Sequence, residues 1–143
     1  QKYLPNLHFG GDSSDVFHHV VSNANSDIYS VGYYRDSVDF DPSGAVDLHI
    51  ADNSISANNY DVVIQKTSST GSVIWTKSIS GANFTWNHSI VCDVNDNIYF
   101  GITHAGQIDV DPGPGVTLSQ NASNFAYALI KLDSNGDFVW SKG

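Results

Sequence analysis

The 143-residue chain contains no glutamate, only one cysteine and only six basic residues. Its fifteen acidic residues are all aspartate, and they give a formal net charge of −9. Aspartate favours turns and cation sites, whereas glutamate favours helices, so the missing glutamate argues against a helical protein. Because a chain this acidic repels nucleic acid and anionic membrane surfaces, we expect no nucleic-acid partner and regard a cation as the better ligand.

The single cysteine, Cys92, excludes an internal disulfide, and no Cys/His spacing typical of zinc sites is present. It lies in the apolar run SIVCDV, which indicates a small core residue rather than a reactive thiol. Long apolar segments are also missing, since no stretch approaches the roughly 18 residues that a membrane-spanning helix needs. The sequence therefore predicts no disulfide framework and no membrane span.

The start of the chain and three sequence motifs favour an extracellular or cell-surface protein. The first residue is Gln1 and no apolar leader follows it, as we expect of the mature product of signal-peptide removal. Three Asn-X-Ser/Thr motifs predict glycan acceptors at Asn83, Asn87 and Asn121. In a chain rich in Asn, Ser and Thr, chance alone also produces such motifs.

The composition favours strands joined by many turns. Only 15% of the residues are charged, while Ser, Asn, Gly, Val, Ile and aromatic residues are plentiful. We therefore expect an all-β fold with almost no helix. The β-rich runs predict strands at these positions: 16–22, 27–34, a short strand into 39–41, 60–67, 72–79, 88–94, 97–103, 107–111, 125–132 and 137–142.

The chain contains an internal repeat. A shift of 70 residues aligns VVSNANSDIYSVG (20–32) with IVCDVNDNIYFGI (90–102). Further on, a shift of 65 residues aligns VVIQKTSSTGSVIWTK (62–77) with YALIKLDSNGDFVWSK (127–142). The difference lies in a loop, where insertions are tolerated. A period of this length indicates one supersecondary unit per repeat, so we predict two tandem antiparallel β-sheet repeats of about 70 residues.

The order of these motifs resembles the SBBP-type β-propeller repeat family of secreted bacterial proteins. The shared elements are NSDIYSVG and NDNIYFGI, the turns DFDPSG and DVDPGPG, and the hairpins QKTSSTGSVIWTK and IKLDSNGDFVWSK. Where the family has a glycine in its first hairpin, this chain has Ser26 and Asp96. The resemblance implies propeller-blade-like sheets and fixes no activity. We expect the first unit in residues 1–75 and the second in residues 76–143.

The ends of the chain raise the question of how the units are covered, because a propeller closes with roughly four to eight blades. The segment 3–9 matches the piece that the second unit lacks after its last strand. It either returns to the C-terminal sheet of its own chain or joins the open edge of the next molecule, which would build a head-to-tail filament. A third alternative is a fragment of a longer protein with flanking repeats. The predicted interface residues are Tyr3, Leu4, Leu7, Phe9 and Trp140.

Each repeat places two aspartates one residue apart before a Pro-Gly turn. The pairs are Asp39 with Asp41 and Asp109 with Asp111. Residues i and i+2 of a strand share a face, so each pair directs two carboxylates to one side. With backbone carbonyls, and with Asp47 in the first repeat, they offer the oxygen ligands that Ca²⁺ prefers. The alternative is an Asx turn, in which each aspartate caps its own backbone without a metal.

Patterns typical of catalysis are missing from the sequence. It contains no HExxH, facial triad or GxSxG, and the adjacent His18 and His19 point to opposite faces of a strand. The aspartate pairs also lack the separation across a cleft that glycosidases use. Trp86 has no partner in the other repeat, so it either stacks on a sugar or a partner, or packs against the sheet.

These observations favour a non-enzymatic extracellular structural protein that is stabilised by calcium and assembles head to tail into a surface fibre or matrix. The alternative is a glycan- or protein-binding adhesin, which would be a lectin-like propeller module. The first hypothesis depends on the repeat, the acidity and the missing catalytic patterns. The second depends on loops and on Trp86.

Overall fold

The computed structural model describes residues 10, 14–52, 60–80, 85–119 and 122–143. Within these ranges the protein is all-β, built from open antiparallel sheets without a helix. The composition predicted this fold class, and the prediction is confirmed. No described segment forms a helix with the length and apolar character needed to cross a membrane.

Ten strands follow one another along the described chain. They are β1 (Val16–Ser22), β2 (Ile28–Tyr34), β3 (Ser37–Asp39), β4 (Leu48–Ile50), β5 (Asp61–Thr67), β6 (Val73–Ile79), β7 (Thr85–Cys92), β8 (Ile98–Gly106), β9 (Ala122–Leu132) and β10 (Phe138–Lys142). Most lie within a few residues of their predicted positions. The segment 3–9, which the sequence predicts to join a sheet edge, lies outside the described residues.

Two differences from the predicted strands concern the segments around the aspartate pairs. The sequence did not predict β4, whose exposed Leu48 and Ile50 give only a short signal. The predicted strand at 107–111 is wrong, because this segment forms a single bridge between Asp109 and Leu118.

The strands form two sheets of four, in the order β1-β2-β5-β6 and β7-β8-β9-β10, and a small sheet of β3 and β4. The pairing corresponds between the larger sheets. Val21 pairs with Tyr29 in the first sheet, and Val91 pairs with Tyr99 in the second. Both β1 and β7 also carry a bulge near their start. We call two positions equivalent when they differ by 70 residues in the first two strands of each sheet, or by 65 in the last two.

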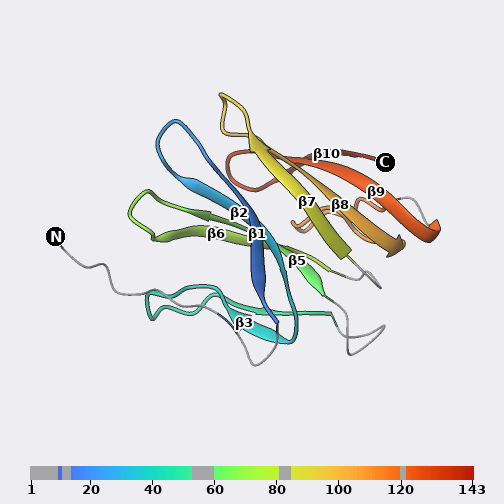
Figure 1. Ribbon diagram of the computed structural model, residues 1–143, viewed down its shortest axis with the longest axis horizontal. Helices are drawn as coiled ribbons and strands as arrows, with labels where there is room; N and C mark the ends of the chain where they lie inside the picture. Colours follow the sequence, from blue (N-terminus) through green and yellow to red (C-terminus); the bar gives the residue numbers. More distant parts are fainter. Residues whose placement is uncertain (1–9, 11–13, 53–59, 81–84, 120–121) are drawn as a thin grey trace.

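One face of the first sheet packs against one face of the second. Figure 1 shows the two sheets side by side, with β7 next to β1, and β7 also contacts β2 and β5. Their shared core includes Tyr29, Val31 and Ile64 from the first sheet and Phe100 and Ile130 from the second, all at most 1% exposed. Burial of each such side chain stabilises the fold by about 1.5–3 kcal/mol, so this core holds the sheets together. We call these two faces the inner faces, and the opposite two the outer faces.

The small sheet of β3 and β4 covers the end of the first sheet's outer face that carries Tyr34 and Val63. A second core forms there from Tyr34, Val38, Phe40, Ala51 and Val63. Consequently β5 is buried on both sides, which explains why DVVI reads as a continuous run rather than an alternation.

Four hairpins close with the same turn, at 23–27, 68–72, 93–97 and 133–137. In each turn the side-chain oxygen of the first residue accepts N–H groups from the third and fifth residues. The fourth residue is left-handed, with these φ angles: Ser26 64°, Gly71 87°, Asp96 63° and Gly136 78°. This conformation costs a residue other than glycine about 1–2 kcal/mol, which explains a glycine preference there.

Candidate functional site

The first aspartate pair forms a hydrogen-bonded turn. Asp39 Oδ1 accepts the backbone N–H groups of Asp41 at 3.1 Å and Asp47 at 2.9 Å. Asp41 Oδ1 accepts the N–H of Ser43 at 2.7 Å. Hydrogen bonds from the Ser43 hydroxyl and then from its N–H hold the pKa of Asp41 below its usual value. These are the contacts of an Asx turn.

The second pair repeats this arrangement. Asp109 Oδ1 accepts N–H groups from Asp111 at 3.1 Å and Thr117 at 2.8 Å, and Asp111 Oδ1 accepts the N–H of Gly113 at 2.8 Å. A Cβ atom at Gly115 would overlap Asp111 Oδ2, so this carboxylate fits only against a glycine. The turn is therefore built around the carboxylate.

The first turn differs from the second at one acidic residue, Asp47, where the second turn has Thr117. Asp47 Oδ1 lies 3.2 Å from His49 Nε2, while Asp47 Oδ2 is buried without a hydrogen-bond partner in the described part of the protein. Among the described residues, no three His, Cys, Asp or Glu side chains gather in a way that holds a metal ion. The hydrogen bonds favour the metal-free turn, and calcium at Asp39, Asp41 and Asp47, or at the second pair, remains a proposal.

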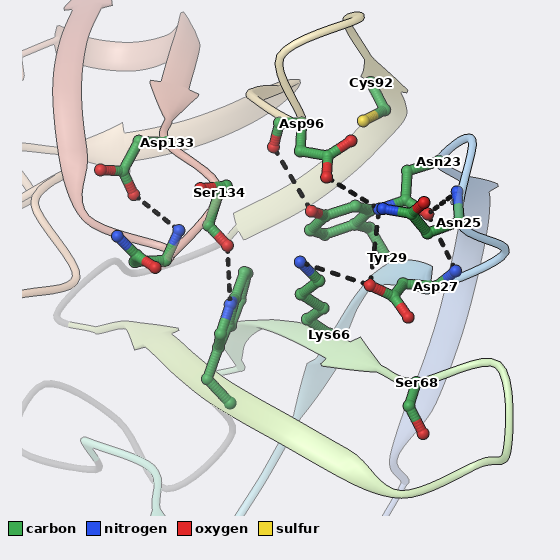
Figure 2. A network of polar contacts seen from close by, with 12 residues as sticks. Asn23, Asn25, Asp27, Tyr29, Lys66, Ser68, Cys92, Asp96, Asp133 and Ser134 are labelled. Carbon is green, nitrogen blue, oxygen red and sulfur yellow. Dashed lines mark hydrogen bonds and ion pairs between the residues drawn. The ribbon is translucent and has the colours of Figure 1, made fainter.

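A polar network joins the two sheets at the end that carries the hairpin turns (Figure 2). The Tyr29 hydroxyl donates to the backbone carbonyl of Asp96 at 3.4 Å, and Asn23 Nδ2 donates to Asp96 Oδ2 at 3.0 Å. Trp75 Nε1 donates to the carbonyl of Ser134 at 3.2 Å. Side chains of the first sheet therefore contact the backbone of two turns of the second.

A lysine and two aromatic rings line the centre of this network. Lys66 Nζ lies 5.0 Å from the centroid of the Tyr29 ring and 3.6 Å from Asp27 Oδ2. The Tyr29 and Trp75 rings pack with centroids 6.0 Å apart. Burial raises the pKa of Tyr29, so its hydroxyl stays protonated and acts as a donor. This arrangement joins the two sheets.

Trp86 lies on the outer face of the second sheet and is 57% exposed. It lines a shallow hollow with His88, Thr103 and Phe125. His88 Nε2 lies 2.6 Å from Thr103 Oγ1, and its ring centroid is 5.9 Å from that of Tyr127. Of the two alternatives for this tryptophan, the exposed position favours contact with a ligand or a partner.

The same outer face carries Trp140, the one predicted interface residue within the described part of the chain. Its ring packs against Tyr99 with centroids 6.0 Å apart, and both side chains are half-buried. The other predicted interface residues, Tyr3, Leu4, Leu7 and Phe9, lie outside the described residues.

Of the three predicted glycan acceptors, only Asn87 lies within the described residues. It is 9% exposed, and its Nδ2 atom makes no hydrogen bond there. A glycan on Nδ2 would have to pass through packed side chains, so this position does not favour Asn87 as an acceptor. Asn83 and Asn121 lie outside the described residues.

Two further titratable side chains of the second sheet are the partly buried Cys92 and the buried His104. Cys92 packs against the shared core, and burial raises the pKa of its thiol, which fits a core residue rather than a reactive one. His104 is 1% exposed, its Nδ1 donates to the Gly106 carbonyl at 3.0 Å, and burial lowers its pKa. The sequence does not single out His104, because a histidine at an inward strand position has no motif of its own.

Comparisons with known protein families, with curated proteins and with solved structures gave no match. The resemblance to SBBP-type repeats therefore stays a prediction. Function has to be inferred from the contacts and surfaces of this chain.

Proposed function

We propose that this protein is a non-enzymatic extracellular structural protein whose two sheets are tandem propeller-blade-like repeats and whose copies join head to tail. One observation carries the proposal, namely the exposed apolar outer face of the second sheet. Four apolar side chains of this face are 50–65% exposed, namely Trp86, Val91, Phe125 and Tyr127. Contiguous apolar surface of this kind marks an interface with a partner.

The repeat is supported by the equal strand order and corresponding register of the two sheets. The blade-like arrangement is supported by the packing of one sheet face on the next, with the first strands β1 and β7 adjacent. Two such sheets leave the outer face of each sheet open. Further sheets can pack on these two outer faces.

The assembly is tested by sedimentation velocity and electron microscopy of the purified chain over a range of concentrations. We expect particles larger than a monomer, whose share grows with concentration. A chain that stays monomeric at every concentration would contradict the proposal. Imaging the same sample with and without a chelator shows whether a cation contributes to the assembly.

Calcium belongs to the proposal at the first aspartate turn. Asp47 Oδ2, buried without a hydrogen-bond partner in the described residues, is the atom that supports a cation there. A ligand that binds only the folded state raises its melting temperature. We expect added Ca²⁺ to raise the melting temperature of the wild type and not that of Asp47→Asn. An unchanged wild type would remove calcium and leave the structural role intact.

A second function is favoured by the hollow beside Trp86. An exposed indole with a neighbouring histidine and threonine offers the stacking and hydrogen-bonding groups that a sugar uses. An adhesin of this kind would bind glycans on an array, and Trp86→Ala would abolish the binding. The control variant Val94→Ala changes a side chain that is 99% exposed in a turn and should bind normally. No binding by the wild type would exclude this alternative.

A further inference from the structure

The contact between the two sheets of one chain shows what the outer face of the second sheet is built to receive. Inside the chain, the first sheet offers Tyr29, Trp75 and Lys66, and they are covered by the turns 93–97 and 133–137 of the second sheet. Figure 2 shows Asp96, from the first of these turns, above the Tyr29 ring. This internal interface serves as the template for a contact between two copies of the chain.

The second sheet carries the same group on its outer face, at the equivalent positions. Tyr99 and Trp140 pack with centroids 6.0 Å apart at 58°, against 6.0 Å and 52° for the covered pair. Lys131 Nζ lies 5.1 Å from the Tyr99 centroid, against 5.0 Å in the first sheet. Beside them Val91 is 56% exposed, whereas its equivalent Val21 packs against the shared core.

The reciprocal half of the interface is exposed on the outer face of the first sheet. Val20 is 66% exposed and Ile28 is 41% exposed. Their equivalents in the second sheet, Ile90 and Ile98, are only 7% and 0% exposed, because the first sheet covers them. Each chain therefore presents both halves of the contact that it makes internally.

The geometry points to a second copy of this chain as the occupant: the outer face of the second sheet docks on the outer face of the first sheet of the next molecule. This inference rests on the proposed function and names its interface. By equivalence, the Tyr99 ring lies against the turn that carries Ser26, and Trp140 Nε1 donates to the carbonyl of Ser69. Unlike Tyr29, Tyr99 already donates its hydroxyl within its own chain, to Asp93 Oδ2 at 2.9 Å. Lys142, equivalent to Lys77, faces the same turn.

A paired exchange of side chains fits this docking. Inside the chain Asn23 donates to the carboxylate of Asp96. Between copies the equivalent residues are Asp93 and Ser26, so a carboxylate faces a hydroxyl. Within its own chain Asp93 Oδ2 already accepts hydrogen bonds from Asn97 Nδ2 at 2.8 Å and from the Tyr99 hydroxyl at 2.9 Å, so the Ser26 hydroxyl would be an additional donor to it. Asp93 is ionised, since hydrogen bonds led by Asn97 lower its pKa to about 2. An aspartate in place of Ser26 would instead set two carboxylates against each other.

The interface is heterologous, because the two docking surfaces differ, and this allows a complementation experiment. Val91→Asp disrupts the docking surface on the second sheet and leaves that on the first sheet intact. Ile28→Asp disrupts the docking surface on the first sheet and leaves that on the second sheet intact. Each variant alone should be monomeric in sedimentation velocity, with association weakened at least tenfold. An equimolar mixture should form a one-to-one dimer that grows no further. Val46→Asp, at a 78% exposed loop position, is the matched control and should assemble like the wild type.

Second variants guard against misfolding, which circular dichroism would reveal. Lys142→Asp replaces Val91→Asp, and Val20→Asp replaces Ile28→Asp. If the wild type assembles and all of these variants assemble equally well, the docking surface is wrong and the proposed function stands. If the wild type never assembles, both fail. If single variants dissociate but their mixture forms no dimer, the head-to-tail pairing of these two faces is overturned.

The shape of the assembly tests the docking of the two outer faces and the formation of a fibre separately. Roughly four to eight sheets close a propeller, so about two to four chains of two sheets would close a ring. A closed ring would support the docking and contradict the fibre, while an open filament would support both.

Discussion

The inner face of the first sheet and the outer face of the second carry the same aromatic pair in two different surroundings. Tyr29 is fully buried under the turns of the second sheet, whereas Tyr99 is only half-buried beside Trp140. Ring geometry is nearly the same in both places, so each sheet builds its pair without help from a neighbour. The difference shows that each pair is formed within its own sheet and that covering the pair is a separate event.

The largest expected effect comes from removing the covered ring. Tyr29→Ala deletes a fully buried aromatic side chain and should lower the free energy of unfolding by about 3–5 kcal/mol. Tyr99→Ala should cost about 1–2 kcal/mol in the monomer, because less of that ring leaves water on folding. Urea unfolding at low protein concentration measures both. Equal losses would break the comparison between the two faces.

A second comparison uses a glycine in each sheet. A Cβ at Gly32 would overlap the backbone carbonyl of Val16, whereas a Cβ at Gly101 would overlap the Tyr127 side chain, which can move. We expect Gly32→Ala to destabilise the fold by about 3 kcal/mol, and Gly101→Ala to cost less. The same unfolding assay decides the order, and a greater loss at Gly101 would show that the Tyr127 ring is fixed.

A third comparison concerns pH at one pair of equivalent buried positions, Tyr34 and His104. Burial lowers the pKa of His104, so below about pH 6.5 the unfolded chain binds a proton that the folded chain does not, and stability falls as the pH falls. Burial raises the pKa of Tyr34 to about 12, so its contribution is lost only above about pH 10. Urea midpoints between pH 5.5 and 7.5 should drop in acid for the wild type and drop less for His104→Asn. An equal drop in that variant would assign the effect to other groups.

The smallest effect is expected at the left-handed turn positions. Ser26→Gly removes backbone strain from an exposed residue and should raise stability by about 0.5–1 kcal/mol. Asp96→Gly relieves the same strain but loses the hydrogen bond from Asn23, so its gain should be smaller or absent. Thermal unfolding of both variants measures the difference. A larger gain at Asp96 would mean that its contact with Asn23 contributes little.

The sequence predicted the all-β fold and the strands of both sheets, because hairpin signals such as the SSTG and DSNG turns are local. It did not predict β4, where only three residues pair. It also offered two alternatives for the aspartate pairs, since an i, i+2 spacing suits a cation and an Asx turn equally. Only the contacts of Asp39 and Asp109 with backbone N–H groups distinguish between them.

The contact between the sheets could not be predicted from the sequence, for a different reason. Tyr29 and Tyr99 have the same neighbours in the chain, so no local pattern tells which ring is covered. Burial depends on what packs above the sheet, as with Ile28 and Ile98, which are 41% and 0% exposed. Likewise, the sequence did not predict whether Trp86 is exposed, because its lack of a partner in the other repeat was the only indication.

The connection between β2 and β5, which contains β3 and β4, affects the order in which the two sheets form. The connection from Tyr34 to Asp61 is longer than the connection from Gly106 to Ala122 in the second sheet. Closing the longer loop costs about 0.5 kcal/mol more entropy, and it has to be closed before β5 can pair with β2. Since non-local pairing slows folding, the second sheet is expected to form first and to serve as the template on which the first one condenses.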